Sequence, residues 1–373
     1  YVGTNAAGTA PPTNVNTKQT EAGISVATGA RGTLISDNLV GGHTSSVVSN
    51  PIIAGITVSS FETTFNNSLA PRDTTIVRNL IGVNSAGTTI PNRVGILLGA
   101  IPNPNYGPYD TQIGDPLDPA GGRNVIAGNI SRGIEITEST QKFGNVTIAG
   151  NYIGLAASGA PQPNGAEGVY VGLYNTAASG DNPVVSIGPA NVIAGNNLFG
   201  IRFRSGGHQV RGNLFGTNLD GSASQLTAPR TANGAASIWI ENGNGITIGG
   251  ASAAERNIIA WSGSTAGGVG AGVLIDPDAS GATNNCGGPC ATGGHTVENN
   301  YIGVNRAGDA ALNPSTDRIG REGIRVRRSA NNVIRGNLIA GGGIGISLGD
   351  TIAGRAANDN LIVANRIGTR ASG

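Results

Sequence analysis

Two short phrases alternate along the whole chain, and this alternation constrains the fold more than any other feature of the sequence. The first phrase is Gly-Ile-x-Ile or a close variant; it begins at residues 23, 55, 95, 133, 168, 200, 272, 323 and 345, and Ser-Ile-Trp-Ile at 237 fills the remaining place. In the second phrase an Asn follows an Ile or Val by three residues; its positions are Asn38, Asn79, Asn129, Asn151, Asn196, Asn213, Asn300, Asn337 and Asn365, with Ser262 in the remaining place. The two sets interleave strictly, so the chain repeats one structural unit.

Each unit is predicted to contain two short β-strands. Alternation along Gly-Ile-x-Ile places both Ile/Val side chains on one face and the x residue on the other. Successive Gly-Ile phrases lie 22 to 51 residues apart, so a fixed strand framework carries connections of variable length. This combination is typical of an all-β parallel solenoid, whose coils stack about 4.8 Å apart. Residues 1–373 are therefore predicted to form one continuous β-helix domain of about ten coils, with long loops on alternate coils.

The repeated Asn residues are predicted to form a structural ladder. An Asn tolerates the left-handed conformation at a sharp corner, and its amide can hydrogen-bond to the same amide one coil above and below. The recurring phrase "NLIGVNSAGT" at residue 79 then has a packing role. Asn79 is a rung of the ladder, Ile81 is a core residue, and Gly82 is the point where the chain turns out into its loop.

Composition excludes several classes of function. Net charge is +1 without a basic block, which argues against nucleic-acid binding. No apolar run reaches the roughly 18 residues of a membrane span. The two cysteines, Cys286 and Cys290, lie in the Gly-Pro loop "NNCGGPC" with only His295 nearby. A small disulfide is favoured over a metal site, which needs about four ligands, and it fits an extracellular setting.

The phrases "NYIG", "RNVIAGN" and "GIxI" resemble the right-handed parallel β-helix repeats of bacterial cell-surface and secreted proteins, which share the superfold of the pectate lyases. The resemblance covers nearly the whole chain and implies an all-β, right-handed, single-stranded parallel β-helix in an extracellular or surface-bound bacterial protein. It leaves the function open, because lyases, hydrolases, epimerases, phage tailspikes, adhesins and passive stalks share this architecture.

The x residues of the first phrase define an outward column, which runs Ser25, Thr57, Leu97, Glu135, Tyr170, Arg202, Trp239, Leu274, Arg325 and Ser347. Within it, Glu135, Tyr170, Arg202 and Trp239 are expected on consecutive coils. Tyr170, Arg202 and Trp239 are the candidate ligand-binding residues, since aromatic rings stack on sugars and Arg binds carboxylates. An ordinary exposed sheet is the competing interpretation.

Catalytic signals are weaker. The motifs Asn-Thr-Asp, Gly-His-Gly and Arg-Ile-Lys of the polygalacturonases are absent, as is the Asp cluster of the pectate lyases. No catalytic residue is therefore predicted; under the alternative of an enzyme, Glu135, Arg202 and Glu241 are the candidates. No metal or cofactor is expected, and a Ca²⁺ ion at Asp276 and Asp278 in "DPDASG" is the alternative.

Two hypotheses of different classes follow. The first is a non-catalytic structural or adhesive segment of a bacterial extracellular or cell-surface protein, serving as a stalk, fibre or display scaffold. The second is a carbohydrate-active β-helix, either a polysaccharide lyase or hydrolase or a glycan-binding module, including tailspike-like proteins. Because the chain begins and ends inside the same phrase, the expected partners are further repeats of the same protein or a head-to-tail copy, with surface polysaccharide as another.

Overall fold

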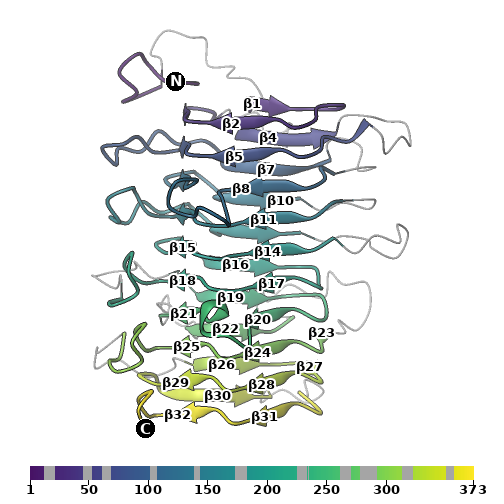
Figure 1. The fold of residues 1–373 in the computed structure, drawn as a ribbon, viewed down its shortest axis with the longest axis vertical. Coiled ribbons are helices and arrows are strands. Elements are labelled where there is room, and N and C mark those ends of the chain that lie inside the picture. Colours follow the sequence, from purple (N-terminus) through teal and green to yellow (C-terminus); the bar gives the residue numbers. More distant parts are fainter. Residues whose placement is uncertain are drawn as a thin grey trace. The chain divides into compact units, whose positions relative to one another are not determined.

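The protein is a right-handed parallel β-helix of about ten coils, built from three parallel ten-stranded sheets in which strand order follows the chain (Figure 1). The computed structural model describes residues 1–11, 22–44, 53–60, 69–100, 107–137, 143–172, 183–224, 233, 235–260, 270–277, 292–312, 322–349 and 357–373. It divides into two compact units, Tyr1–Asn191 and Val192–Gly373, called unit 1 and unit 2 below.

The first sheet carries the Gly-Ile-x-Ile phrases. Its strands in unit 1 are β1 (Ala22–Val26), β4 (Ala54–Ser60), β7 (Val94–Ala100), β10 (Ile134–Ile136) and β13 (Val169–Val171). Its strands in unit 2 are β16 (Phe199–Phe203), β19 (Ala236–Ile240), β22 (Ala271–Ile275), β26 (Glu322–Val326) and β30 (Ile344–Leu348).

The second sheet follows the first around each coil. Its strands in unit 1 are β2 (Leu34–Ser36), β5 (Thr75–Val77), β8 (Thr111–Ile113), β11 (Val146–Ile148) and β14 (Val185–Ile187). Its strands in unit 2 are β17 (Gln209–Val210), β20 (Thr247–Gly249), β24 (Thr296–Glu298), β28 (Val333–Arg335) and β31 (Leu361–Val363).

The third sheet completes each coil. Its strands in unit 1 are β3 (Leu39–Val40), β6 (Leu80–Ile81), β9 (Val125–Ile126) and β12 (Tyr152–Ile153). Its strands in unit 2 are β15 (Val192–Ile193), β18 (Leu214–Phe215), β21 (Ile258–Ile259), β25 (Tyr301–Ile302), β29 (Leu338–Ile339) and β32 (Arg366–Ile367). Two short strands, β23 (Thr292–Gly293) and β27 (Ser329–Ala330), pair apart from these sheets, and a 3₁₀ turn, η3, spans Ala253–Glu255.

Each coil thus has three strands, and the prediction of two strands is wrong. The reason is that the second phrase occurs at two different corners. Asn151 follows the second-sheet strand β11, whereas Asn129 follows the third-sheet strand β9. Both corners need a left-handed residue before the Asn, here Gly150 at φ 74° and Gly128 at φ 70°. Two corners with the same local geometry therefore have the same sequence phrase.

The Asn ladder exists, but as more than one row. At the corner between the second and third sheets, the Oδ1 atom of each Asn accepts from the backbone N–H and side-chain amide of the preceding one. The rows are Asn38, Asn79, Asn124, Asn151 and Asn191 in unit 1, and Asn213, Asn257, Asn300, Asn337 and Asn365 in unit 2. Every step in both rows carries both bonds.

Asn129 and Asn196 belong to the other corner. Asn129 bonds to Asn92 and Asn164 in unit 1, and Asn196 donates to Asn233 in unit 2 at 3.0 Å. Their place in the first row is taken by the Asn that opens each "NVIAGN" segment, Asn124 or Asn191. The single ladder expected from the sequence is corrected accordingly, and Ser262 lies outside the described residues.

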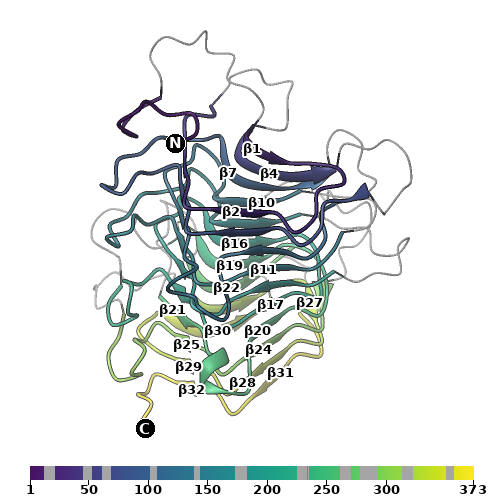
Figure 2. The same ribbon diagram turned by 45° about the horizontal axis from the view of Figure 1, so that its top comes forward.

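The interior of the coils is apolar, as the alternation along the first sheet predicts. The inward pair of β10, Ile134 and Ile136, is fully buried, and so is the inward pair of β19, Ile238 and Ile240. In each unit the strands of successive coils lie as stacked rungs, visible obliquely in Figure 2. The fold thus buries one column of Ile and Val side chains per sheet, which is the main source of its stability.

The longer connections of alternate coils begin with a short hairpin, here called an arm. Isolated antiparallel bridges close the arms at residues 83–89 and 155–161 in unit 1 and at 217–224 and 304–311 in unit 2. In the second arm of unit 2, Asn305 Oδ1 accepts from the backbone N–H of Asp309 at 3.1 Å, and the N–H of Gly308 donates to the Asn305 carbonyl. Gly308 has φ +73°, so a left-handed turn makes each arm compact.

Within each unit, successive arms are hydrogen-bonded to one another, and so are an arm and the turn at residues 5–10 in unit 1 or 370–373 in unit 2. In every case the acceptor is the carbonyl of a glycine in the arm or turn. In unit 1, Asn84 Nδ2 donates to Gly8 O at 3.0 Å, and Gln162 Nε2 donates to Gly87 O at 2.8 Å. In unit 2, the backbone N–H groups of Arg306 and Ala371 donate to Gly221 O and Gly308 O at 3.0 and 2.8 Å. The recurring phrase "NLIGVNSAGT" and its relatives therefore form a second stack of turns beside the coils.

The part of the chain that the structure describes has no helix with the length and apolar character to cross a membrane.

Candidate functional site

The outward column of the first sheet has the predicted register. In unit 1, Glu135 pairs with Leu97 on one side and Tyr170 on the other. In unit 2, Arg202 pairs with Trp239, which pairs in turn with Leu274. Period-two alternation was sufficient for this result, because a strand of the first sheet has no freedom to turn its x residue inward.

In unit 1 two residues of the column, Glu135 and Tyr170, form a cluster with Arg132 and Glu167 of the adjoining corners. Arg132 Nη1 lies 2.6 Å from Glu135 Oε1, and Arg132 Nε lies 2.9 Å from Glu167 Oε2. The Arg132 guanidinium also lies over the Tyr170 ring, 3.8 Å from its centroid. Arg132 therefore joins two acidic side chains of neighbouring coils.

The electrostatics of this cluster are those of a partly buried ion network. Burial raises the pKa of the Glu135 carboxyl above its ordinary value, and the nearby Arg132 charge opposes that effect without cancelling it. Glu167 is 1% exposed and Tyr170 is 5% exposed. The cluster thus combines a carboxyl whose pKa is raised with a second carboxylate held in an ion pair.

In unit 2 two residues of the column, Arg202 and Trp239, form an Arg-rich counterpart with Arg204 and Glu241. Glu241 Oε2 lies 2.8 Å from Arg202 Nη2 and 3.3 Å from Arg204 Nε. Arg202 lies over the Trp239 ring, 4.5 Å from its centroid. One carboxylate here joins two guanidinium groups. Glu241 and Arg202, which are candidate catalytic residues if the protein is an enzyme, are therefore paired with each other.

Trp239 does not present its ring to the surface. It is 2% exposed, its Nε1 donates to the Asp276 carbonyl at 2.9 Å, and its ring centroid lies 4.6 Å from that of Phe199. Tyr170 is similarly covered by Arg132. Of the three residues expected to bind a ligand, only Arg202 is half-exposed.

The loop acids and cysteines are placed only in part. Asp276 is 3% exposed, and its Oδ2 lies 3.5 Å from Arg327 Nη1. Asp278, Cys286 and Cys290 lie outside the described residues. Across the described ranges, no group of three or more His, Cys, Asp or Glu side chains is arranged to hold a metal ion.

Two histidines of unit 2 lie inside the coils, each just before a second-sheet strand. His208 and His295 are fully buried. Burial lowers the pKa of His208 to about 3 and that of His295 to about 4. His208 Nε2 lies 2.8 Å from Ser205 Oγ, and His295 Nδ1 accepts from the Ile246 N–H at 3.1 Å. Both rings are therefore neutral core groups.

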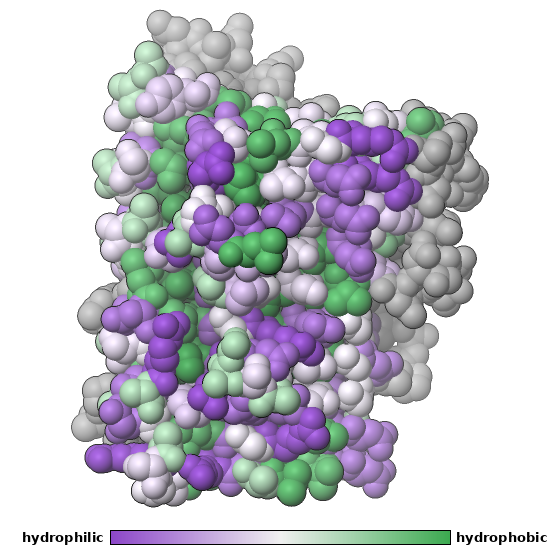
Figure 3. All heavy atoms as spheres, in the orientation of Figure 1, coloured by the Kyte–Doolittle hydropathy of each residue, from purple (hydrophilic) through white to green (hydrophobic). Residues whose placement is uncertain are grey.

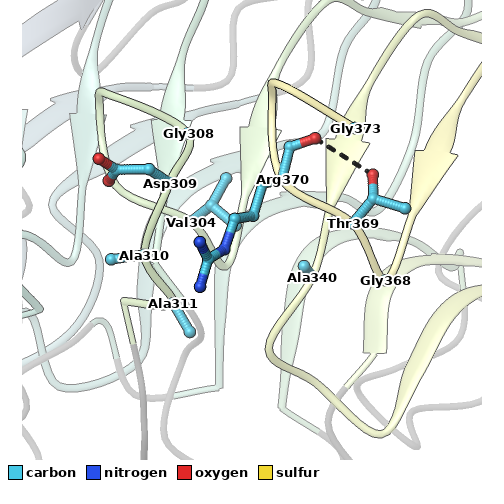
Figure 4. Close-up of a pocket in the computed structure, with 10 residues that line it drawn as sticks. All are labelled: Val304, Gly308, Asp309, Ala310, Ala311, Ala340, Gly368, Thr369, Arg370 and Gly373. Atoms are coloured by element: carbon cyan, nitrogen blue, oxygen red, sulfur yellow. Dashed lines mark hydrogen bonds between the residues drawn. The ribbon is translucent and has the colours of Figure 1, made fainter.

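A different kind of site lies beside the arms of unit 2. Three hollows occur there, of about 730, 300 and 240 Å³. The largest is drawn in Figure 4: Gly308 to Ala311 form one wall, and Gly368 to Arg370 form the other. The Arg370 side chain extends across it toward Ala310 and Ala311, while Asp309 points away.

The two smaller hollows share one arginine. Arg256 lines both; Arg306 completes the hollow of about 300 Å³, and Arg366 completes that of about 240 Å³. Arg256 is fixed by Asn299, to whose carbonyl Nε donates at 3.1 Å and to whose Oδ1 Nη2 donates at 2.8 Å. Its guanidinium also lies 4.0 Å from the centroid of the Tyr301 ring.

Arg132, Glu167, Arg256 and Arg306 were not among the sequence candidates. A signal for one of them exists: "RNVI" at 123 and "RNII" at 256 are each followed on the next coil by "NYIG". Both produce the same Arg–Tyr contact, and Arg123 lies 4.1 Å from the Tyr152 centroid. Arg132 and Glu167 sit in corners, where strand alternation does not predict direction.

Comparison with protein-family models, curated proteins and solved structures finds no match to the chain.

Proposed function

We propose that this chain is a non-catalytic structural or adhesive segment of a bacterial extracellular or cell-surface protein, where it serves as a stalk, fibre or display scaffold. The observation that carries the proposal is the internal use of its polar groups. Amides are joined in rows at the corners, and arms are joined through glycine carbonyls. These bonds make each coil fit the next and leave few groups for chemistry.

The surface is consistent with that role. On the face in Figure 3, hydrophilic and hydrophobic residues are interspersed among the coloured atoms, without one continuous apolar band. The arm tips expose small side chains, such as Ser85 and Ala86 in unit 1 and Ala307 in unit 2. Loops that vary on a rigid framework are the usual place for recognition.

The test is an activity screen on acidic and neutral polysaccharides with the purified protein. Reducing ends report hydrolysis, and ultraviolet absorbance of unsaturated uronates reports elimination. A scaffold produces neither signal. Turnover that disappears in both Glu135→Gln and Arg202→Gln would overturn the proposal.

A second candidate function is carbohydrate cleavage at the Arg132 cluster. The observation that favours it is the raised pKa of Glu135 beside a second carboxylate, Glu167, since glycosidases use one protonated and one ionised carboxyl. The matched control is Glu298→Gln, because Glu298 is also paired with an arginine, Arg335. Enzymatic turnover would be lost in Glu135→Gln and kept in the control.

A further inference from the structure

Four asparagines of the chain precede a glycine: Asn164, Asn233, Asn242 and Asn244. In this dipeptide an asparagine side chain is most prone to lose ammonia, because glycine has no Cβ to hinder its own backbone nitrogen from approaching the preceding side chain. That nitrogen can then attack the carboxamide carbon. Since the dipeptide is the same at all four positions, the fold determines which of them reacts.

Two of the four are rungs of the corner rows, which hold their side chains away from this reaction. Asn164 Nδ2 donates to the Ile126 carbonyl at 3.2 Å, and Asn164 Oδ1 accepts from Asn129 Nδ2 at 2.9 Å. Asn233 Nδ2 likewise donates to a main-chain carbonyl of another coil at 3.1 Å, and its Oδ1 accepts from Asn196 at 3.0 Å. Both side chains are fully buried. Their carboxamides are therefore fixed and kept from water.

The other two lie in the turn between β19 and β20 of unit 2, and they differ in the hydrogen bond of the glycine nitrogen. The Gly245 N–H donates to the Gly293 carbonyl of the next coil at 3.1 Å. This nitrogen is engaged by the main chain, although Asn244 itself is exposed. The Gly243 N–H instead donates to Asn242 Oδ1 at 2.8 Å, and no backbone acceptor among the described residues takes it.

The turn thus holds the Asn242 side chain against the nitrogen that would attack it. The 2.8 Å bond folds the carboxamide back onto its own main chain, and the carbon to be attacked is one covalent bond from the contacting oxygen. Gly243 has φ +100°, and a Cβ there would collide with the backbone of Ser205. Only glycine therefore suits this position. Asn242 is partly exposed, which gives water access to it.

We propose that Asn242 is a site of spontaneous deamidation in the folded protein, where the chain gains negative charge as it ages. The Gly243 nitrogen loses its proton to hydroxide and forms a bond to Asn242 Cγ. The carboxamide nitrogen takes up a proton and leaves as ammonia, so that a five-membered succinimide remains. Water then opens the ring at either carbonyl and gives aspartate or isoaspartate. The net reaction consumes one water and releases one ammonia, without an oxidant or reductant.

The product changes both the charge and the main chain of this turn. A new carboxylate follows Glu241 directly, and Glu241 Oε2 lies 2.8 Å from Arg202 Nη2 and 3.3 Å from Arg204 Nε. Isoaspartate also adds one methylene to the main chain, at a residue whose N–H donates to the Phe203 carbonyl at 3.2 Å. Modification of Asn242 therefore adds negative charge beside the ion pairs of unit 2 and lengthens the corner that follows β19. This inference is independent of the scaffold role.

The experiment incubates the purified full chain at mildly alkaline pH, either folded or unfolded in urea, and maps its tryptic peptides by mass spectrometry. Peptide 231–256 contains three of the four asparagines, so its fragment ions locate each change. In the folded protein Asn242 is expected to convert about tenfold faster than Asn244, the factor that one hydrogen bond to the Gly245 nitrogen provides. In urea all four asparagines should convert at similar rates, because they share one dipeptide.

Two variants test the position. Asn242→Gln should abolish the change there, since glutamine would have to close a six-membered ring, and Asn244→Gln is the matched control that leaves conversion of Asn242 unchanged. Isoelectric focusing should show an acidic band in the aged wild type and in the control, and none in Asn242→Gln. Conversion of Asn244 or of a ladder asparagine as fast as that of Asn242 in the folded protein would overturn the inference. An Asn242 that converts in urea and stays intact in the folded chain would overturn it equally.

Discussion

Asn79 donates its side-chain amide to Asn124 Oδ1 at 3.0 Å, and its backbone N–H donates to the same oxygen at 2.9 Å. One acceptor atom thus joins two coils through both the main chain and the side chain. The Asn79 amide also donates to the carbonyls of Ile35 and Val77. Each rung satisfies groups on three successive coils, all buried or half-buried.

Removing such a rung is expected to destabilise the fold. Asn79→Ala leaves the carbonyls of Ile35 and Val77 and the N–H of Asn38 without their partner, and each buried loss costs about 1–3 kcal/mol. The free energy of unfolding, measured by urea titration, should fall by about 2–5 kcal/mol. Asn242→Ala is the control, because the Oδ1 of Asn242 accepts from the N–H of its own neighbour, Gly243. An equal loss of stability there would contradict the role of the row.

The arms are expected to contribute a smaller, local stabilisation. Asn84 Oδ1 accepts from the N–H groups of Ala86 and Thr88, and its amide reaches Gly8 O. Asn84→Ala should therefore speed amide hydrogen exchange within residues 83–90 and cost about 1–2 kcal/mol. The exposed Ser85→Ala should change neither. Exchange that stays slow in the Asn84 variant would show that the arm is held by its turn alone.

Buried histidines predict a loss of stability in acid. The pKa of His208 is about 3 and that of His295 is about 4 in the folded protein, whereas an unfolded His titrates near 6.5. Below pH 6.5 the unfolded chain binds the protons, so the free energy of unfolding falls by roughly 1.4 kcal/mol per pH unit for each ring until its folded pKa is reached. Above pH 6.5 these two groups have no effect.

His295→Val tests whether the buried histidines cause the loss of stability in acid. Valine is chosen because Val146 occupies the corresponding strand-start position on another coil. The variant loses one hydrogen bond to Ile246 and is expected to be less stable at neutral pH. Its stability should nevertheless decline less steeply between pH 6.5 and 4 when urea unfolding is measured across that range. An unchanged slope would place the acid sensitivity elsewhere.

Substitutions at two glycines of unit 1 can distinguish the cost of backbone strain from the cost of a steric clash. Gly114 at φ +79° and Gly29 at φ +82° have nearly the same conformation. A Cβ on Gly114 would collide with the Ala149 carbonyl and the Asn151 amide, whereas nothing lies within 4 Å of one on Gly29. Gly29→Ala should cost about 1 kcal/mol, and Gly114→Ala several times more, in urea unfolding. Equal costs would mean that the corner has room for a side chain.

The residues that could be predicted from the sequence are those whose direction is set by strand alternation. Glu135, Arg202 and Trp239 appear where the Gly-Ile-x-Ile phrase places them. Trp239 was nevertheless expected to be available for binding, and its burial depends on Phe199 and Arg202, which no spacing indicates.

Corners were harder to predict. Asn129 and Asn151 end the same sequence phrase, so the sequence alone does not show that they lie at different corners. For that reason two strands per coil were predicted instead of three. The hollow beside Arg256 depends on η3, the arm that carries Arg306 and third-sheet strands of successive coils meeting, although they lie far apart in the chain. Such contacts follow from the stack as a whole rather than from any local pattern.

The bonds between arms also limit how such a protein changes its length. Gly87 and Gln162 meet because their arms are separated by one coil that has no arm. Inserting or deleting a single coil would bring an arm against a coil without one, and the glycine carbonyl at that junction would lose its donor. A gene that grows or shrinks by duplication should therefore do so by two coils at a time, which makes the pair of coils the heritable unit of the fold.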